Sequence, residues 1–257
     1  MSRIQSLFAQ KQEKILSIYC TAGFPQLDST LKVMQALQEN GADIIELGMP
    51  YSDPLADGPV IQESNTIALH NGMHLSLLFE QLRDMRKDIH IPVILMGYMN
   101  PAMQYDFEKF CSDAAAVGVD GLILPDLPDH AFETKYGEVM QRYGLDFIFL
   151  VTPETSEARI RKLDRLSSGF LYAVASSATT GSENNMSLVN AYLRRLSAMK
   201  LSNPLMVGFG ISSGAHFAAV CQDVRGAIVG SAYIRTLLNN SDVSFATKQF
   251  MQQMRNV

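Results

Sequence analysis

A glutamate inside an apolar segment is the first feature of the sequence that suggests chemistry. Glu46 lies in residues 43–47, between Ile45 and Leu47. Successive side chains of a strand point to opposite faces, so Ile45 and Leu47 are predicted to face outward and Glu46 inward. Burial disfavours the charged carboxylate and raises its pKa toward neutrality, as a general acid or base at pH 7 requires. The alternative is a structural ion pair, but no lysine or arginine lies in another predicted strand.

A second carboxylate, Asp57, lies in the loop that follows this segment. Prolines at positions 50, 54 and 59, together with Gly58, stiffen the loop, because proline fixes φ. A stiff polar loop can hold a carboxylate against a ligand. The Asp57-Gly58 pair is also typical of a simple turn, and Asp53, which precedes a proline, is interpreted as a turn former. Asp57 is therefore a candidate site residue with a structural alternative.

Two glycine-rich segments end predicted strands late in the chain. Residues 207–212 read VGFGIS, and residues 228–232 read IVGSA. The backbone N–H groups of such turns, with a helix N-terminus, bind phosphate in many barrels. Glycine also simply ends strands, so one turn is weak evidence, whereas two in succession predict a phosphate site. The polar segment 175–185 has the composition of a mobile loop over a site, or of a loop without function.

Residues that would support other mechanisms are missing from the predicted strand ends. No lysine follows a strand, which disfavours Schiff-base chemistry. The five histidines form no cluster with ligand spacing, so no metal site is expected. Carboxylate acid/base chemistry on a phosphorylated small molecule remains.

Alternating apolar runs and amphipathic stretches must position these residues. Eight strands with helices between them predict an α/β fold, a single (β/α)8 TIM-barrel domain over residues 1–257 with an extra N-terminal helix over 4–12. An open doubly wound sheet is disfavoured, because no G-x-G-x-x-G follows the first strand. The strands are predicted over 15–20, 43–47, 92–97, 121–124, 147–151, 170–174, 205–209 and 227–229, and the helices over 29–40, 75–87, 107–116, 132–142, 156–166, 188–199, 213–221 and 245–254.

Composition excludes several classes of protein. Lysine and arginine total 21 against 26 acidic residues, a net charge of −5, which disfavours nucleic-acid binding. The apolar runs fall far short of the ~18 residues of a membrane span, and no secretory signal is recognised. The three cysteines, Cys20, Cys111 and Cys221, form no disulfide framework and fit a reducing compartment, so a cytoplasmic protein is expected.

Residues 46–62, ELGMPYSDPLADGPVIQ, resemble the signature of the tryptophan synthase alpha subunit family. The resemblance covers nearly the whole chain and includes residues 6–8, 21–25, 125–128, 207–211 and 229–232. It implies a lyase of tryptophan biosynthesis that reversibly cleaves indole-3-glycerol phosphate to indole and glyceraldehyde 3-phosphate. It also implies a partner, the beta subunit, in an alpha-beta-beta-alpha heterotetramer. No cofactor is expected in this chain, because the pyridoxal phosphate belongs to the beta subunit.

The same resemblance assigns roles to residues. Glu46 matches the catalytic glutamate that protonates indole C3 and takes the proton of the side-chain hydroxyl, and Asp57 matches the catalytic aspartate that bonds the indole N–H. The other matches are substrate-binding positions at Tyr19, Ile61, Met96, Tyr172, Thr180 and Phe209, and phosphate-binding positions at Gly181, Gly210, Gly230 and Ser231.

Two other functions stay open at this point. One is a phosphate-binding barrel without activity of its own that activates the beta subunit, and the intact Glu46 and Asp57 speak against it. The other is a different phosphate-barrel enzyme, such as a sugar-phosphate isomerase, which lacks support because no histidine or lysine follows a strand.

Overall fold

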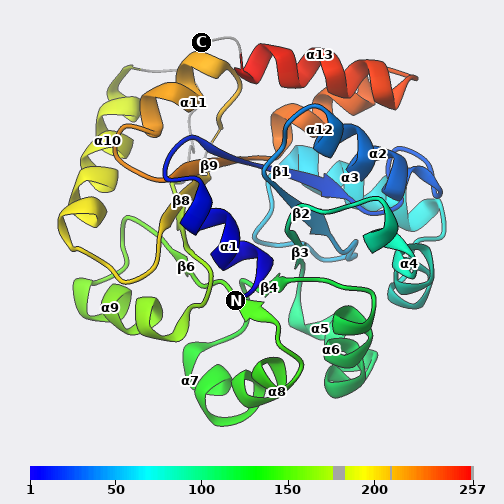
Figure 1. The fold of residues 1–257 in the computed structure, drawn as a ribbon, viewed down its shortest axis with the longest axis horizontal. Coiled ribbons are helices and arrows are strands. Elements are labelled where there is room, and N and C mark those ends of the chain that lie inside the picture. Colours follow the sequence, from blue (N-terminus) through cyan, green and yellow to red (C-terminus); the bar gives the residue numbers. More distant parts are fainter. Residues whose placement is uncertain (176–182, 209, 256–257) are drawn as a thin grey trace.

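The computed structural model describes residues 1–175, 183–208 and 210–255. Within these ranges, parallel strands surround a central axis and helices cover the outside (Figure 1). The strands are β1 (Ile15–Thr21), β2 (Ile44–Gly48), β3 (Val93–Met96), β4 (Gly121–Ile123), β5 (Asp146–Phe147), β6 (Leu150–Val151), β7 (Leu171–Val174), β8 (Leu205–Gly208) and β9 (Gly226–Val229).

The barrel closes through one bent segment. The hydrogen-bonded order is β5-β4-β3-β2-β1-β9-β8-β7-β6, so β5 and β6 lie at its two ends. Two residues join them: the Ile148 N–H donates to the Leu122 carbonyl of β4, and the Phe149 carbonyl accepts from the Tyr172 N–H of β7. The strand predicted over 147–151 therefore pairs with β4 at its start and with β7 at its end. The fold is the predicted TIM barrel, with all eight predicted strands in place.

The helices begin at polar caps that satisfy free backbone N–H groups. Asp106, Ser156 and Ser213 each accept a hydrogen bond from the backbone N–H three residues later, as helix caps do. The helices are α1 (Arg3–Gln10), α2 (Ser29–Glu39), α3 (Pro59–His70), α4 (Leu75–Leu82), α5 (Met99–Gln104), α6 (Phe107–Ala116), α7 (Asp129–Ala131), α8 (Gly137–Arg142), α9 (Glu157–Leu166), α10 (Glu183–Ala198), α11 (Gly214–Val220), α12 (Ser231–Leu238) and α13 (Val243–Arg255).

Three helices that are each the next element after a strand are missing from the sequence-based prediction: α3, α5 and α12. In α3, Ser64 and Asn65 lie on the buried face together with Ile61 and Ala68. Polar residues on that face hide the apolar period on which the prediction depends. Helix α5 has only six residues, too few for a recognisable period.

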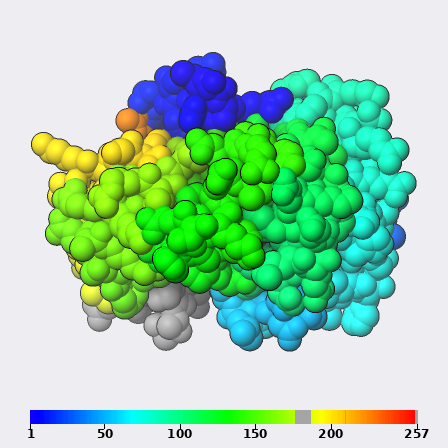
Figure 2. All heavy atoms as spheres, turned by 90° about the horizontal axis from the view of Figure 1, so that it is seen from below, coloured from blue at the N-terminus to red at the C-terminus, as the bar shows by residue number. Residues whose placement is uncertain are grey.

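Apolar side chains fill the barrel, and α1 closes its N-terminal end. In Figure 1, α1 lies across the middle of the barrel, and Figure 2 places it on the face opposite the loop between β2 and α3. The fully buried Ile4 packs into the interior, and the Phe8 ring lies 6.0 Å from that of Phe170. The interior cluster also contains Ile15, Ile44, Ile94, Ile123, Ile148, Tyr172, Met206 and Ile228.

Two further features bear on the class of protein. No helix within the described ranges has both the length and the apolar character that a membrane crossing requires. Cys20 and Cys111 are buried free thiols, and Cys221 is a partly buried one.

Candidate active site

Glu46 lies in the middle of β2 and points into the barrel, as its alternation with Ile45 and Leu47 predicts. Its side chain is fully buried. The side chains of Ile45 and Leu47 are buried too, but they pack on the other face of the strand, in the layer between strands and helices. The Ser17 hydroxyl of β1 donates a hydrogen bond to Glu46 Oε1 (2.8 Å). Among the described residues, Oε2 has no hydrogen-bond partner and no cation pairs with the carboxylate. Burial raises the pKa of Glu46 to about 8, and the Ser17 hydrogen bond opposes this shift only in part.

Two tyrosines fill the barrel near Glu46 because glycines leave room for them. Tyr19 pairs in register with Glu46, and its hydroxyl lies where a Cβ on Gly48 would be, within 2.1 Å. Tyr172 occupies the corresponding space beside Gly208, within 2.3 Å. Burial and the carboxylates of Glu46 and Asp57 raise the pKa of Tyr172, so its hydroxyl stays protonated. Any side chain at either glycine would displace a tyrosine from the barrel.

Asp57 lies in the loop between β2 and α3, half-buried, and Tyr98 holds it in place. The Tyr98 hydroxyl donates to Asp57 Oδ2 (3.0 Å) and accepts from the Ala56 N–H (3.0 Å). Burial raises the pKa of Asp57, and the hydrogen bond from Tyr98 partly offsets that shift. Tyr98 therefore ties the Asp57 end of the loop to the segment that follows β3.

A small pocket at the C-terminal ends of β1, β2 and β3 brings part of the predicted site together. Tyr19, Asp57 and Met96 line it, all three of which are predicted site residues. Ile61 is buried against the outer core and does not line this pocket. The remaining lining residues are Met49, Asn65, Gly97, Tyr98 and Pro125.

The glycine-rich turns lie side by side, as adjacent strands require. Strand β8 pairs with β9, so Gly210 and Gly230 follow neighbouring strand ends. Gly230 is the N-terminal cap of α12 and Ser231 its first residue, and no side chain caps this helix within the described part of the chain. The first N–H groups of α12 are thus available to an anion. Gly210 is exposed.

Three predicted site residues, Thr180, Gly181 and Phe209, lie outside the described residues.

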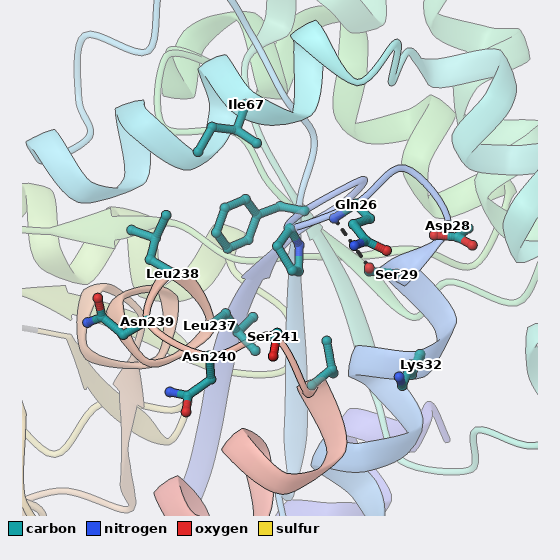
Figure 3. A pocket seen from close by; sticks show the side chains of 13 residues that line it. Gln26, Asp28, Ser29, Lys32, Ile67, Leu237, Leu238, Asn239, Asn240 and Ser241 are labelled. Atoms are coloured by element: carbon teal, nitrogen blue, oxygen red, sulfur yellow. Dashed lines mark hydrogen bonds between the residues drawn. The ribbon is translucent and has the colours of Figure 1, made fainter.

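A larger hollow of about 650 Å³ lies away from these acids (Figure 3). Gln26, Asp28, Ser29 and Lys32 border it on one side, and the turn 239–241 borders it on the other. Neither Glu46 nor Asp57 lines it. In the described ranges, no group of three or more histidine, cysteine or acidic side chains is arranged to hold a metal ion.

The sequence pattern did not assign Asn65, Ser17 or Tyr98 to the site. Asn65 follows Ile61 by four residues on α3, so helical spacing from Ile61 was the signal that could have found it. Ser17 lies on β1 and Tyr98 follows β3, the two strands that flank β2, so the pairing of these strands brings both residues to the two acids.

Comparisons with known proteins agree over the full chain. The family model described as tryptophan synthase alpha chain matches residues 6–257. The chain is 48% identical to the tryptophan synthase alpha chain of Parabacteroides distasonis over 99% of its length and 100% of that protein. It resembles the solved tryptophan synthase alpha subunit of Legionella pneumophila (TM-score 0.91, 36% identity, covering 100% and 98% of the two chains). A chain of the M. tuberculosis tryptophan synthase in its aminoacrylate-bound form is also similar (TM-score 0.85, 31% identity, covering 99% and 98%).

Proposed function

This chain belongs to the tryptophan synthase alpha chain family, and from that premise we propose which of its residues perform the family reaction. The chain is a lyase that cleaves indole-3-glycerol phosphate to indole and glyceraldehyde 3-phosphate in tryptophan biosynthesis. The observation that carries the residue assignment is Glu46, a fully buried carboxyl group with one unpartnered oxygen among the described residues and a pKa raised to about 8.

Glu46 is the general acid and base in this proposal. With a pKa near 8, it is protonated at pH 7 and donates its proton to indole C3. The resulting carboxylate then takes the proton of the hydroxyl on the carbon bonded to C3. The bond between C3 and that carbon breaks, its electrons return to the ring, and an aldehyde forms. Glu46 ends protonated, so the same group serves the reverse reaction.

Asp57 stabilises the charge that protonation creates. When C3 gains a proton, positive charge develops at the ring nitrogen, and a carboxylate accepting the N–H lowers the energy of that state. The hydrogen bond from Tyr98 fixes one oxygen of Asp57 and leaves the other for the ring. The hydrogen bond from Tyr98 thus holds the carboxylate in place before the charge forms, which is electrostatic preorganisation.

The remaining walls orient the substrate. Tyr19 and Met96 border the pocket, and Tyr172 lies within the barrel near Glu46. We assign the phosphate to Gly210, Gly230 and Ser231, where free N–H groups begin α12. By the resemblance alone, Ile61, Thr180, Phe209 and Gly181 complete the site.

The chain carries no cofactor of its own, and it acts with the beta subunit of tryptophan synthase, which holds the pyridoxal phosphate, in an alpha-beta-beta-alpha assembly. We further propose that residues 1–257 form one domain and that the protein works in the cytoplasm, where its three free thiols would stay reduced.

The test is indole release from indole-3-glycerol phosphate, measured with and without the beta subunit. The wild type should release indole, and Glu46→Gln should lower kcat by about 10³-fold while a glycerol phosphate analogue still binds. Full activity of Glu46→Gln would refute the residue assignment. An inactive wild type, alone and with the beta subunit, would refute the activity itself.

A further inference from the structure

Asn65 is a buried polar residue for which the assigned mechanism has no use. It lies on α3, 3% exposed, and lines the same pocket as Asp57 and Tyr98. Its carboxamide oxygen Oδ1 is buried and has no hydrogen-bond partner among the described residues. In that part of the chain, the only other buried side-chain oxygen or nitrogen without a partner is Oε2 of Glu46.

An unpaired acceptor in a buried position costs stability, because it has lost water and gained nothing in exchange. Buried polar groups without a partner are therefore rare in native proteins. They persist where a ligand supplies the missing partner, since the site is then already arranged for it. Of the two unpartnered atoms among the described residues, Glu46 Oε2 belongs to the proposed general acid inside the barrel, and Asn65 Oδ1 belongs to a residue that lines the pocket with Asp57.

Other asparagines of the chain show what a structural role looks like. Asn71, at the end of the same helix, donates from Nδ2 to the carbonyls of Gly23 and Pro25 (2.9 and 3.0 Å). Asn203 donates to the Asp164 carbonyl (2.6 Å) and so joins the segment before β8 to α9. Asn65 Oδ1 makes no such connection within the described residues, although it is more deeply buried than either of these two.

We propose that Asn65 is a substrate-binding residue whose Oδ1 accepts a hydrogen bond from a donor of the bound substrate. The inference rests on the proposed function of this site. Indole-3-glycerol phosphate has two kinds of donor, the ring N–H and the glycerol hydroxyls. Asn65 holds the substrate in register between Asp57 and Glu46.

The experiment compares Asn65→Leu, an apolar residue of similar size, with wild type. Two probes separate the donors: 3-indolylpropyl phosphate has the ring N–H but no hydroxyl, and glycerol 3-phosphate has hydroxyls but no ring. We expect about tenfold weaker binding of the probe that carries the donor. The kcat/KM for indole-3-glycerol phosphate should fall by a similar factor, and the melting temperature should not fall, because the lost acceptor had no partner among the described residues. Asn65→Ala, whose smaller side chain cannot overpack the site, should weaken the binding of the same probe.

Asn71→Leu is the matched control. It should lower the melting temperature, because it removes two hydrogen bonds, and leave both probe affinities unchanged. Unchanged affinity of Asn65→Leu and Asn65→Ala for both probes would overturn the inference. That result is distinct from failure of the proposed function, in which wild-type protein releases no indole or Glu46→Gln remains active.

Discussion

Buried acids lie at the N-terminal end of this barrel and also inside it, and their surroundings differ. At the N-terminal ends of the strands, Asp120 accepts from the guanidinium groups of Arg3 (2.9 Å) and Arg86 (2.5 Å) and from the Val93 N–H (2.8 Å). Asp43, Asp146 and Asp164 are likewise hydrogen-bonded there. Further along the barrel, Glu46 has one hydrogen bond and no cation among the described residues.

The difference separates stability from chemistry. Asp120 and Asp164, each of which accepts hydrogen bonds on both oxygens, hold the strand starts to neighbouring segments. An acid with a free oxygen and a raised pKa contributes nothing comparable to the fold, but it can exchange a proton. In barrels of this kind, the N-terminal end serves stability and the C-terminal end serves catalysis. Four experiments test whether stability and catalysis are divided between the two ends of the barrel in this way.

The largest effect on stability is expected from Asp120→Ala. It leaves two guanidinium groups and one backbone N–H without their partner, which costs about 3 kcal/mol of unfolding free energy. The rate of indole release per folded molecule should not change. Chemical denaturation and the indole assay measure the two quantities. Asp84→Ala, which removes an exposed ion pair with Lys87, is the control and should show no measurable loss. A comparable loss of unfolding free energy in both variants would show that the buried hydrogen bonds of Asp120 do not stabilise the fold more than an exposed ion pair does.

The contribution of Glu46 to the free energy of unfolding should decrease as the pH rises. Its pKa is 4.5 in the unfolded chain and about 8 in the fold. Its contribution is complete below pH 4.5 and is lost as pH rises to about 8, by at most ~1.4 kcal/mol per pH unit. The difference in unfolding free energy between wild type and Glu46→Gln should therefore change across this range and flatten above it. A constant difference from pH 5 to 8 would show that the carboxyl group is not buried as described.

The cleavage rate should depend on the same proton. If protonated Glu46 is the acid, kcat/KM for indole-3-glycerol phosphate falls about tenfold per pH unit above about pH 8. A pH–rate profile from pH 6 to 10 measures this. A rate that stays constant to pH 9.5 would exclude Glu46 as the proton donor.

The smallest effect is expected from Tyr98→Phe. It removes the hydrogen bond that holds Asp57, so kcat/KM should fall by about three- to tenfold with little loss of stability. Tyr105→Phe is the matched control, because Tyr105 also donates to an aspartate, Asp113, and neither residue lines the pocket. Equal kinetic effects of both variants would show that the Tyr98 hydroxyl has no special role.

Much of the fold could be predicted from the sequence, because the strands of a covered barrel are nearly continuous apolar runs. Every predicted strand is present, within one or two residues at its ends, apart from the bend at Ile148 and Phe149. Helix α6 matches its prediction at both ends, and α10 begins five residues earlier than predicted. Of the helices missing from the prediction, α3 has polar residues on its buried face and α5 has only six residues, so neither shows a clear helical period.

For the site, the sequence was informative where one residue violates its surroundings. Glu46 stands out as an acid in an apolar strand, and period-2 alternation alone predicts that it points inward. The cause of its raised pKa could also be anticipated, since it is burial. Asp57 was left between a turn and a ligand-binding role, because local sequence does not show what a loop residue contacts.

The sequence by itself determined the strands, the inward acid and the glycine-rich turns, because these follow from patterns within a few residues. Tertiary structure alone decided which groups meet: Ser17 with Glu46, Tyr98 with Asp57, and Asn65 with the pocket. Ser17 and Glu46 are 29 positions apart in the chain, and Asp57 and Tyr98 are 41 positions apart. The physical reason is that strand register and helix packing, which no local pattern encodes, set the distances between side chains from different elements.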